Sequence, residues 1–413
     1  MNTDAQTLRN LPLEAFDHPR PGDAWDRSPL VGASDARLAA AVVAAITPPK
    51  LAAASSFVLH APLELLARVA LLAHVAPAAR AQARRQVAAV AVRYAHAGAE
   101  ADVPRASFAS DAAALGALLA SLGNGDPDGV DSALCFLLPR VPLWRLRTAL
   151  VDELAPRLGA AAHAPILLAA LPRVADRIAG VGGLLRAPLR TLAGSAERLT
   201  WHRDAAAMAS APSPDPAHAL FEALAAAPRL KSSSMIAPTM LAVERSGDAA
   251  RLLAGPVQTL SPGQAERVLL RVAAQSMLQD DPAHAPYGWT HCLSLPQALL
   301  ANADAATDTR ALVAVAATQV LAFRATQGAV TLAADAVPAA PALARADQMC
   351  ALATRAALHP DAHLAKYTLA CFDAAARDAD AAPAVPRRGG PPQRVVGRPR
   401  HGVAMSRPDN PLP

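Results

Sequence analysis

The chain has 413 residues, 53% of them hydrophobic, so it is long enough to bury one large core or several smaller ones. Its formal net charge is +5, and residues 377–413 supply +4 of that, with seven arginines against three aspartates. The body of the chain is therefore nearly neutral, which excludes the broad basic surface that nucleic-acid binding requires. We expect no nucleic-acid partner.

The cysteines and the apolar segments indicate a soluble protein of a reducing compartment. Four cysteines are scattered without a CxxC pair, so they form neither a disulfide framework nor a zinc knuckle. The N-terminus is polar and proline-rich, unlike a signal peptide. Apolar runs such as 38–46 are shorter than the roughly 20 residues that span a bilayer. We expect a cytoplasmic protein that does not enter a membrane.

The composition predicts an all-α fold. Alanine and leucine dominate, aromatic residues make up 3% of the chain, and no alternating strand pattern of useful length occurs. Proline and glycine punctuate the helical segments. Helices are expected, in chain order, at 35–47, 57–75, 78–97, 110–122, 132–156 in short turns, 187–201, 217–226, 232–245, 263–278, 305–327, 341–358 and 358–373. Packed helical hairpins would then form a large helical bundle.

Composition also divides the chain. Residues 1–33 are expected to form an irregular N-terminal arm, and residues 34–376 a helical domain. The Ala-Pro-Ser-Pro-Asp-Pro stretch at 211–216 is the best candidate for an internal break. Residues 377–413 are rich in Pro, Arg and Gly and cannot bury a core, so they are expected to be a disordered tail.

Two glycine clusters, at 123–129 and 180–183, resemble phosphate loops superficially. No strand precedes either cluster, and the first contains aspartates that would repel phosphate. We therefore interpret both as turns.

Four of the twelve histidines stand out, because each lies beside apolar helical sequence instead of a charged patch. His60 and His163 each begin a His-Ala-Pro helix start, while His291 and His363 lie within apolar segments. Their spacing along the chain is too large for a linear zinc motif, so a shared site would have to be assembled from several helices. Imidazole suits zinc, copper, iron and nickel, and packing of four core histidines is the alternative.

Lys366 lies three residues after His363, on the same face of the expected helix. The chain has only three lysines, whereas arginine fills most cationic positions. A buried amine can lose its proton and react, which a guanidinium cannot do. The alternative is a lysine whose stem packs against apolar neighbours while its ammonium reaches water.

Four short segments, in order, resemble the questin oxidase-like family. His-Ala-Pro at 60–62 and His-Ala-Pro-Ile at 163–166 are similar to its first two histidine segments. His-Cys-Leu-Ser-Leu-Pro-Gln-Ala at 291–298 and Ala-His-Leu-Ala-Lys-Tyr-Thr at 362–368 resemble its His-x-hydrophobic-Ser/Thr-x-Pro-x-Ala and His-x-x-Lys-aromatic-Thr segments. The resemblance implies an all-helical oxidoreductase that opens or oxygenates a ring of a polycyclic aromatic polyketide with O2.

The resemblance also implies a non-haem Fe(2+) centre. Its metal ligands would be four histidines and a lysine carboxylated by CO2, at positions His60, His163, His291, His363 and Lys366. His363 and Lys366 would also be the catalytic residues. NADPH is the reductant that the resemblance implies, although the chain has no Rossmann fingerprint.

Further residues are expected around this centre. Glu64 is a candidate acceptor for an imidazole N–H. Phe57, Tyr287, Trp289 and Tyr367 could line a flat aromatic pocket or simply belong to the core.

One departure from the family and two other functions stay open. Where the family pattern continues into packed helices after Asp373, this chain becomes rich in Arg, Pro and Gly. A helical-repeat interaction protein without catalysis would use the histidines for packing. A closed structural zinc or copper site would use them as ligands without an open position.

Overall fold

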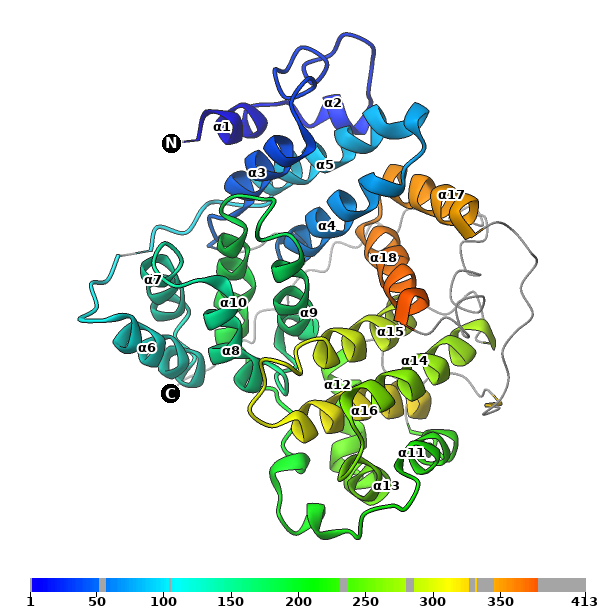
Figure 1. Cartoon of the computed structure of the whole chain (residues 1–413). Coiled ribbons are helices and arrows are strands. Elements are labelled where there is room, and N and C mark those ends of the chain that lie inside the picture. The colour runs from blue at the N-terminus through cyan, green and yellow to red at the C-terminus, as the bar shows by residue number, and fades with distance from the viewer. Residues whose placement is uncertain are drawn as a thin grey trace, which may run out of the picture.

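The computed structural model describes residues 2–51, 57–103, 105–230, 236–279, 286–326, 331–332 and 345–377, with the backbone alone at 160–161, 286–290 and 345. Within these residues the chain forms 18 α-helices, joined by loops and short 3-10 turns, and no β-strand (Figure 1). Two isolated bridges, Lys50 with Glu100 and Arg157 with Arg198, are the extended pairings in this part of the chain. The all-α prediction is confirmed.

The first ten helices build one core, which we call the N-terminal core. Its buried side chains run from Ala5 to Ala193 and are joined by Ala357. The helices are α1 (Thr3–Arg9), α2 (Glu14–Asp17), α3 (Asp35–Ile46), α4 (Phe57–Leu71), α5 (Arg80–Ala95), α6 (Asp111–Asn124), α7 (Pro127–Leu137), α8 (Leu143–Leu154), α9 (His163–Ala170) and α10 (Arg186–Ala193).

One of the remaining helices, at 345–358, packs in a small third cluster with Ala67, Leu71, Ala365 and Phe372. The others build the C-terminal core, whose buried side chains run from Val151 to Ala374. At its centre lies α16, where every residue from Leu312 to Thr326 is buried. The helices are α11 (Pro216–Ala225), α12 (Ile236–Arg245), α13 (Asp248–Val257), α14 (Pro262–Gln279), α15 (Pro286–Leu300), α16 (Thr309–Thr326), α17 (Arg345–Leu358) and α18 (Ala362–Arg377).

Residues 1–33, expected to be irregular, contain the short helices α1 and α2. Leu8 and Phe16 from these helices are buried in the N-terminal core. Arg85 of α5 forms an ion pair with Asp23 and so holds the following loop against the same core. Apolar side chains and one buried arginine thus fix this segment.

Some helix boundaries differ from the predicted ones. The helix expected at 187–201 ends at Ala193, where Gly194 follows and the chain turns. Helix α13, which was not predicted, begins after Gly247, whose φ of 77° is a left-handed conformation that glycine adopts without strain. The helix within 57–75 was expected to start near His60, with Pro62 in its first turn. It starts at Phe57 instead, so Pro62 lies inside it.

Residues 211–216 form a loop that ends where the Asp215 side chain accepts a hydrogen bond from the His218 N–H and caps α11. Trp201 before the loop and Leu220 after it belong to the same C-terminal core. Of the predicted tail, Arg377 is the last residue of α18 and forms an ion pair with Glu266. The rest, 378–413, lies outside the described residues.

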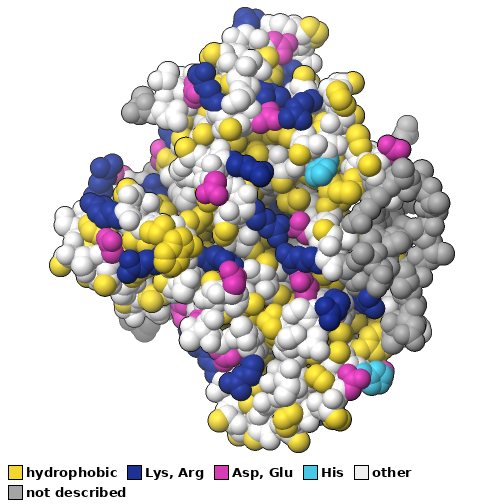
Figure 2. Space-filling view, in the orientation of Figure 1, with side chains coloured by type: hydrophobic (Ala, Val, Ile, Leu, Met, Phe, Trp, Pro, Cys, Tyr) yellow, Lys and Arg dark blue, Asp and Glu magenta, His cyan; other side chains and the backbone are white. Residues whose placement is uncertain are grey.

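One stretch, Phe57–His74, is long and apolar enough to cross a membrane by composition alone. Of that window 61% is buried inside the protein, and a core helix of a soluble protein meets the same criterion. On the face of the molecule seen in Figure 2, acidic and basic side chains are interspersed, as the near-neutral charge of the body leads one to expect.

Four helices meet where the two cores adjoin. Helix α4 packs against α9 and α18, and α15 packs against α9 and α18 as well. Figure 1 shows these four helices grouped near the middle of the molecule. Helices α4 and α9 bury apolar side chains in the N-terminal core, whereas α15 and α18 contribute to the C-terminal core.

Candidate functional site

Each of the four helices at the junction carries one of the histidines singled out in the sequence. His60 lies in the first turn of α4, His163 is the first residue of α9, His291 lies in α15, and His363 lies in the first turn of α18. Lys366 follows one turn later in α18. The fold therefore brings the five residues to one region, although up to 306 positions separate them along the chain.

The four imidazole rings form a closed circuit in which each is adjacent to two others. The distances between ring centres are 4.7 Å for His60–His163, 5.3 Å for His163–His291, 6.2 Å for His291–His363 and 4.9 Å for His363–His60. All four pairs are edge-to-face, with angles between ring planes of 61–83°.

These separations suit rings that surround one ion. A ring nitrogen bound at about 2.0–2.1 Å places the ring centre roughly 3 Å from the metal. The centres of two such rings then lie about 4.5–6.5 Å apart for ligand angles from about 90° to 180°. All four observed distances fall within that range.

The nitrogen atoms fit less closely than the ring centres. Nε2 of His291 lies 3.4 Å from Nε2 of His163, as expected for two ligands about 110° apart around one ion. As the rings are oriented, however, no three His, Cys, Asp or Glu side chains among the described residues form a group that could hold a metal ion.

Asp361 orients His363, and the sequence analysis did not identify this role. Its Oδ1 lies 3.0 Å from His363 Nδ1 and also accepts a hydrogen bond of 2.8 Å from the His363 backbone N–H. These hydrogen bonds hold the pKa of Asp361 at about 2, so the carboxyl is ionised. An acidic residue two positions before a helix-starting histidine was the available signal. A carboxylate on Nδ1 leaves Nε2 of this ring as the metal-binding nitrogen.

Burial favours the unprotonated forms of His60 and Lys366. Desolvation, followed by the nearby Lys366, His363 and His291, lowers the pKa of His60 to about 3. Desolvation also lowers the pKa of Lys366 to about 8, although Glu64 and Asp361 act in the opposite direction. A neutral imidazole and an amine that loses its proton near neutral pH are the forms that bind metals.

Glu64 has a different partner from the one predicted. Its carboxylate accepts a hydrogen bond of 2.7 Å from Arg68, one turn further along α4, and both side chains are almost completely buried. Arg68 also donates to the backbone carbonyls of Ala357 and His359, at 2.9 and 2.8 Å. Arg68 is therefore the counterion of this buried carboxylate, and a further hydrogen bond to Glu64 from an imidazole N–H stays a prediction.

The start of α9 is held in place by an uncommon backbone conformation and by an amide. Ala162, directly before His163, has a φ of 54° and is the one non-glycine residue with positive φ in the described chain. Asn302, which follows α15, donates to the carbonyl of Pro165 at 3.2 Å and to that of Ala298 at 2.7 Å. This amide links the helix of His163 to that of His291.

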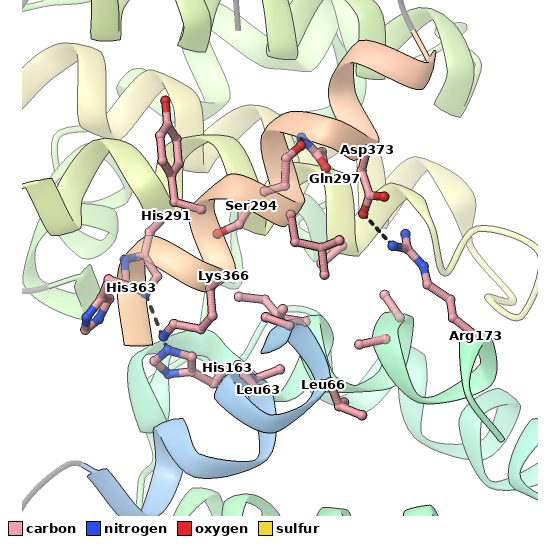
Figure 3. Close-up of a pocket in the computed structure, with 18 residues that line it drawn as sticks. Leu63, Leu66, His163, Arg173, His291, Ser294, Gln297, His363, Lys366 and Asp373 are labelled. Carbon is pink, nitrogen blue, oxygen red and sulfur yellow. Dashed lines mark hydrogen bonds and ion pairs between the residues drawn. The ribbon is translucent and has the colours of Figure 1, made fainter. Parts of the chain in front are cut away.

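A cavity of about 90 Å³ begins at the imidazoles. His163, His291, His363 and Lys366 line one end, and the ion pair of Arg173 with Asp373 lies at the other (Figure 3). Between the two ends, the labelled side chains are Leu63 and Leu66 from α4 and Ser294 and Gln297 from α15. The cavity is therefore polar at both ends and mainly apolar between them.

The aromatic lining was predicted only in part. Tyr367 lines the cavity, whereas Phe57 packs against the N-terminal core and is not among the lining residues. The side chains of Tyr287 and Trp289 lie outside the described residues. Leucine, isoleucine and alanine form half of the described lining residues.

Comparison with protein-family models, with curated proteins and with solved structures gives no match to this chain.

Proposed function

We propose that the chain is an iron-dependent oxidoreductase that oxygenates an aromatic, polyketide-like substrate with O2, as the resemblance to the questin oxidase-like family implies. The observation that carries the proposal is the closed circuit of four imidazoles beside Lys366 at the inner end of a cavity. Packing histidines would not need to converge from four helices on one point, whereas metal sites in helical bundles are built in this way. Three of the four, His163, His291 and His363, also line the cavity.

His60, His163, His291 and His363 would hold the iron, with Lys366 as a carboxylated fifth ligand. Four neutral imidazoles leave the ion's charge uncompensated, and a carbamate supplies an anionic oxygen. The amine forms the carbamate by attacking CO2 and releasing a proton, which requires its neutral form; the lowered pKa of Lys366 favours that form. When bound, the iron would supply O2 activation.

The protein's own residues would orient these ligands and bind the substrate. Asp361 fixes the tautomer of His363. The aliphatic wall between the two ends would bind an apolar ring system and keep water away. A volume of about 90 Å³ is smaller than the roughly 300–1,000 Å³ of most small-molecule sites. A polycyclic substrate would therefore extend outward past Arg173 and Asp373.

The proposal assigns no site to NADPH. The described part of the chain has no strands and hence no Rossmann βαβ unit for a dinucleotide. Any NADPH requirement would be met by electrons delivered from outside this fold.

Elemental analysis of the protein purified without chelator tests the proposal. We expect about one iron per chain, and a loss of at least 10-fold in metal affinity in the His163→Gln variant, because this histidine is a buried member of the circuit. His218→Gln, which changes an exposed histidine of α11, is the control and should keep its iron.

Two results would count against the proposal. Equal metal content in the two variants would refute the ligand set. Stoichiometric zinc that is unaffected by bicarbonate, with no iron bound on reconstitution, would support a closed structural site instead.

A further inference from the structure

A second cavity lies apart from the imidazoles and shares no lining residue with the first. Its volume is about 720 Å³, within the range of small-molecule sites. It is formed by the loop at 105–107, by α7 and the turn that follows it, and by the segment that leads from Gly180 to the start of α10.

The charged side chains that line this cavity are all basic among the described residues. Three arginines line it (Arg105, Arg140 and Arg186), and no Asp or Glu does so among the described residues. Arg186 is compensated by Asp131, a completely buried carboxylate that accepts two hydrogen bonds of 2.7 Å from its guanidinium. Neither of the other two arginines has an ion-pair partner within the described chain, which leaves an excess of two positive charges facing the cavity.

The two uncompensated arginines are presented differently. Arg140 lies over the Phe136 ring at 4.1 Å and donates a hydrogen bond of 2.8 Å to the Phe136 carbonyl, which fixes the direction of its guanidinium. Arg105 is exposed in the loop across the cavity, where the Ala106 N–H donates to Ser132 of α7. One cation is therefore held in place and the other is adaptable.

The remaining wall is apolar or backbone. Phe136 and Leu138 contribute ring and methyl surface. Gly182 and Gly183 bring the main chain close to α7 and α3, since a Cβ would lie 3.0 Å from Leu138 or 2.7 Å from Thr47. The glycines are thus explained by packing, and recognition of a ligand would depend on the arginines and the aromatic ring.

We propose that this cavity binds a small organic anion whose oxyanion group pairs with Arg105 and Arg140 and whose ring or alkyl part contacts Phe136 and Leu138. Phosphate and carboxylate share the planar or forked oxygen arrangement that guanidinium groups recognise, so either group fits the site. The ligand is distinct from the substrate of the imidazole site.

Calorimetric titration of the full chain tests this with phenyl phosphate, benzoate and the neutral benzyl alcohol as probes. We expect an anionic probe to bind at least 10-fold more tightly than benzyl alcohol, and the preference between the two anions distinguishes phosphate from carboxylate ligands. The double variant Arg105→Gln/Arg140→Gln should weaken anion binding at least 10-fold. Arg145→Gln, an exposed arginine of α8 that does not line the cavity, should leave it unchanged.

Thiol labelling locates the bound probe. Cys135 lines this cavity and Cys350 does not, although both are partly exposed. A saturating anionic probe should slow the alkylation of Cys135 and leave that of Cys350 unchanged, as read by mass spectrometry. No binding, equal binding by the double variant, or an unprotected Cys135 would each overturn the proposal.

Discussion

The surroundings of Lys366 determine the pKa of its amine. An amine at this place lies close to the imidazoles, in a cavity where aliphatic residues form half of the lining. Glu64 and Asp361 favour its protonation, but desolvation outweighs them and the pKa falls. The same position filled by arginine would stay charged at every accessible pH.

We predict that Lys366→Arg leaves the protein folded but lowers its iron affinity at least 10-fold, because a guanidinium cannot be carboxylated. Metal content after reconstitution with iron and bicarbonate measures the effect. Lys50→Arg is the control, since Lys50 contacts the Ala95 carbonyl and the Tyr94 ring, both of which arginine can also contact. Iron retained by the Lys366 variant would exclude the carbamate.

We predict that His202 makes the protein less stable to unfolding at acidic pH. Desolvation and Arg203 lower its pKa to about 4, against weaker opposing effects of Glu244 and Asp308. Its Nδ1 is buried and has no hydrogen-bond partner among the described residues. His202 is therefore protonated below about pH 6.5 in the unfolded chain but only below about pH 4 in the folded protein. The free energy of unfolding falls as the pH falls through this range, by up to roughly 3 kcal/mol.

Urea unfolding of the wild type and His202→Gln at pH 8 and pH 4.5 measures this contribution. The variant should lose less stability between the two pH values. Equal losses would show that His202 does not titrate differently in the folded and unfolded states.

At the scale of elements, Arg68 fixes how α4 sits against the turn between α17 and α18. Its guanidinium spans from Glu64 on its own helix to two carbonyls at the end of α17. His60 is two turns before Arg68 in α4, and His363 begins α18 four residues after His359. The buried ion pair therefore sets the distance between two of the four imidazoles.

We predict that Arg68→Met destabilises the protein by about 3–5 kcal/mol, because it leaves the Glu64 carboxylate buried without a counterion. The double variant Glu64→Leu/Arg68→Met should recover part of that loss. Arg37→Met, which breaks the exposed pair with Asp4, should cost less than about 1 kcal/mol. Urea denaturation measures all three, and a similar cost for the Arg68 and Arg37 variants would contradict the argument.

Local chemistry explains which elements were predictable. Helices with a capping serine and a proline boundary, such as α3, were placed to within one residue at 35–47. Helix α13 was missed because a left-handed glycine, and not a capping side chain, begins it. The five site residues could be proposed from residue type and resemblance. The contact of Asp361 with His363 and the Glu64–Arg68 pair are local, at spacings of two and four residues, so their spacing was visible in the sequence. The convergence of four helices was not, because it depends on packing between segments far apart in the chain.

At the scale of the whole molecule, the candidate site joins the two cores. His60 and His163 belong to helices of the N-terminal core, and His291 and His363 to helices that contact the C-terminal core. Arg147 of α8 adds a link, since it donates to Asn302 and to the Ala301 carbonyl at the end of α15. A metal bound here would hold both cores together.

Metal loading should therefore protect both cores at once. At a free metal concentration 100 times its Kd, we expect a gain of about 2.7 kcal/mol in the free energy of unfolding. Hydrogen exchange should slow in α5 and in α16, which lie in different cores. Protection confined to one of these helices would show that the bound metal does not bridge them.

The left-handed turn at Ala162 has a consequence for evolution and engineering. An L-residue with a Cβ pays about 1–2 kcal/mol in this conformation, and a glycine would not. Ala162→Gly should then raise the free energy of unfolding, measured by urea denaturation, by up to about 1 kcal/mol. The backbone before α9 would become more flexible, and we expect iron to bind less tightly. Alanine at position 162 thus lowers the stability of the fold but restricts the backbone that positions the His163 imidazole. Selection for activity would therefore keep alanine here, although glycine gives the more stable protein.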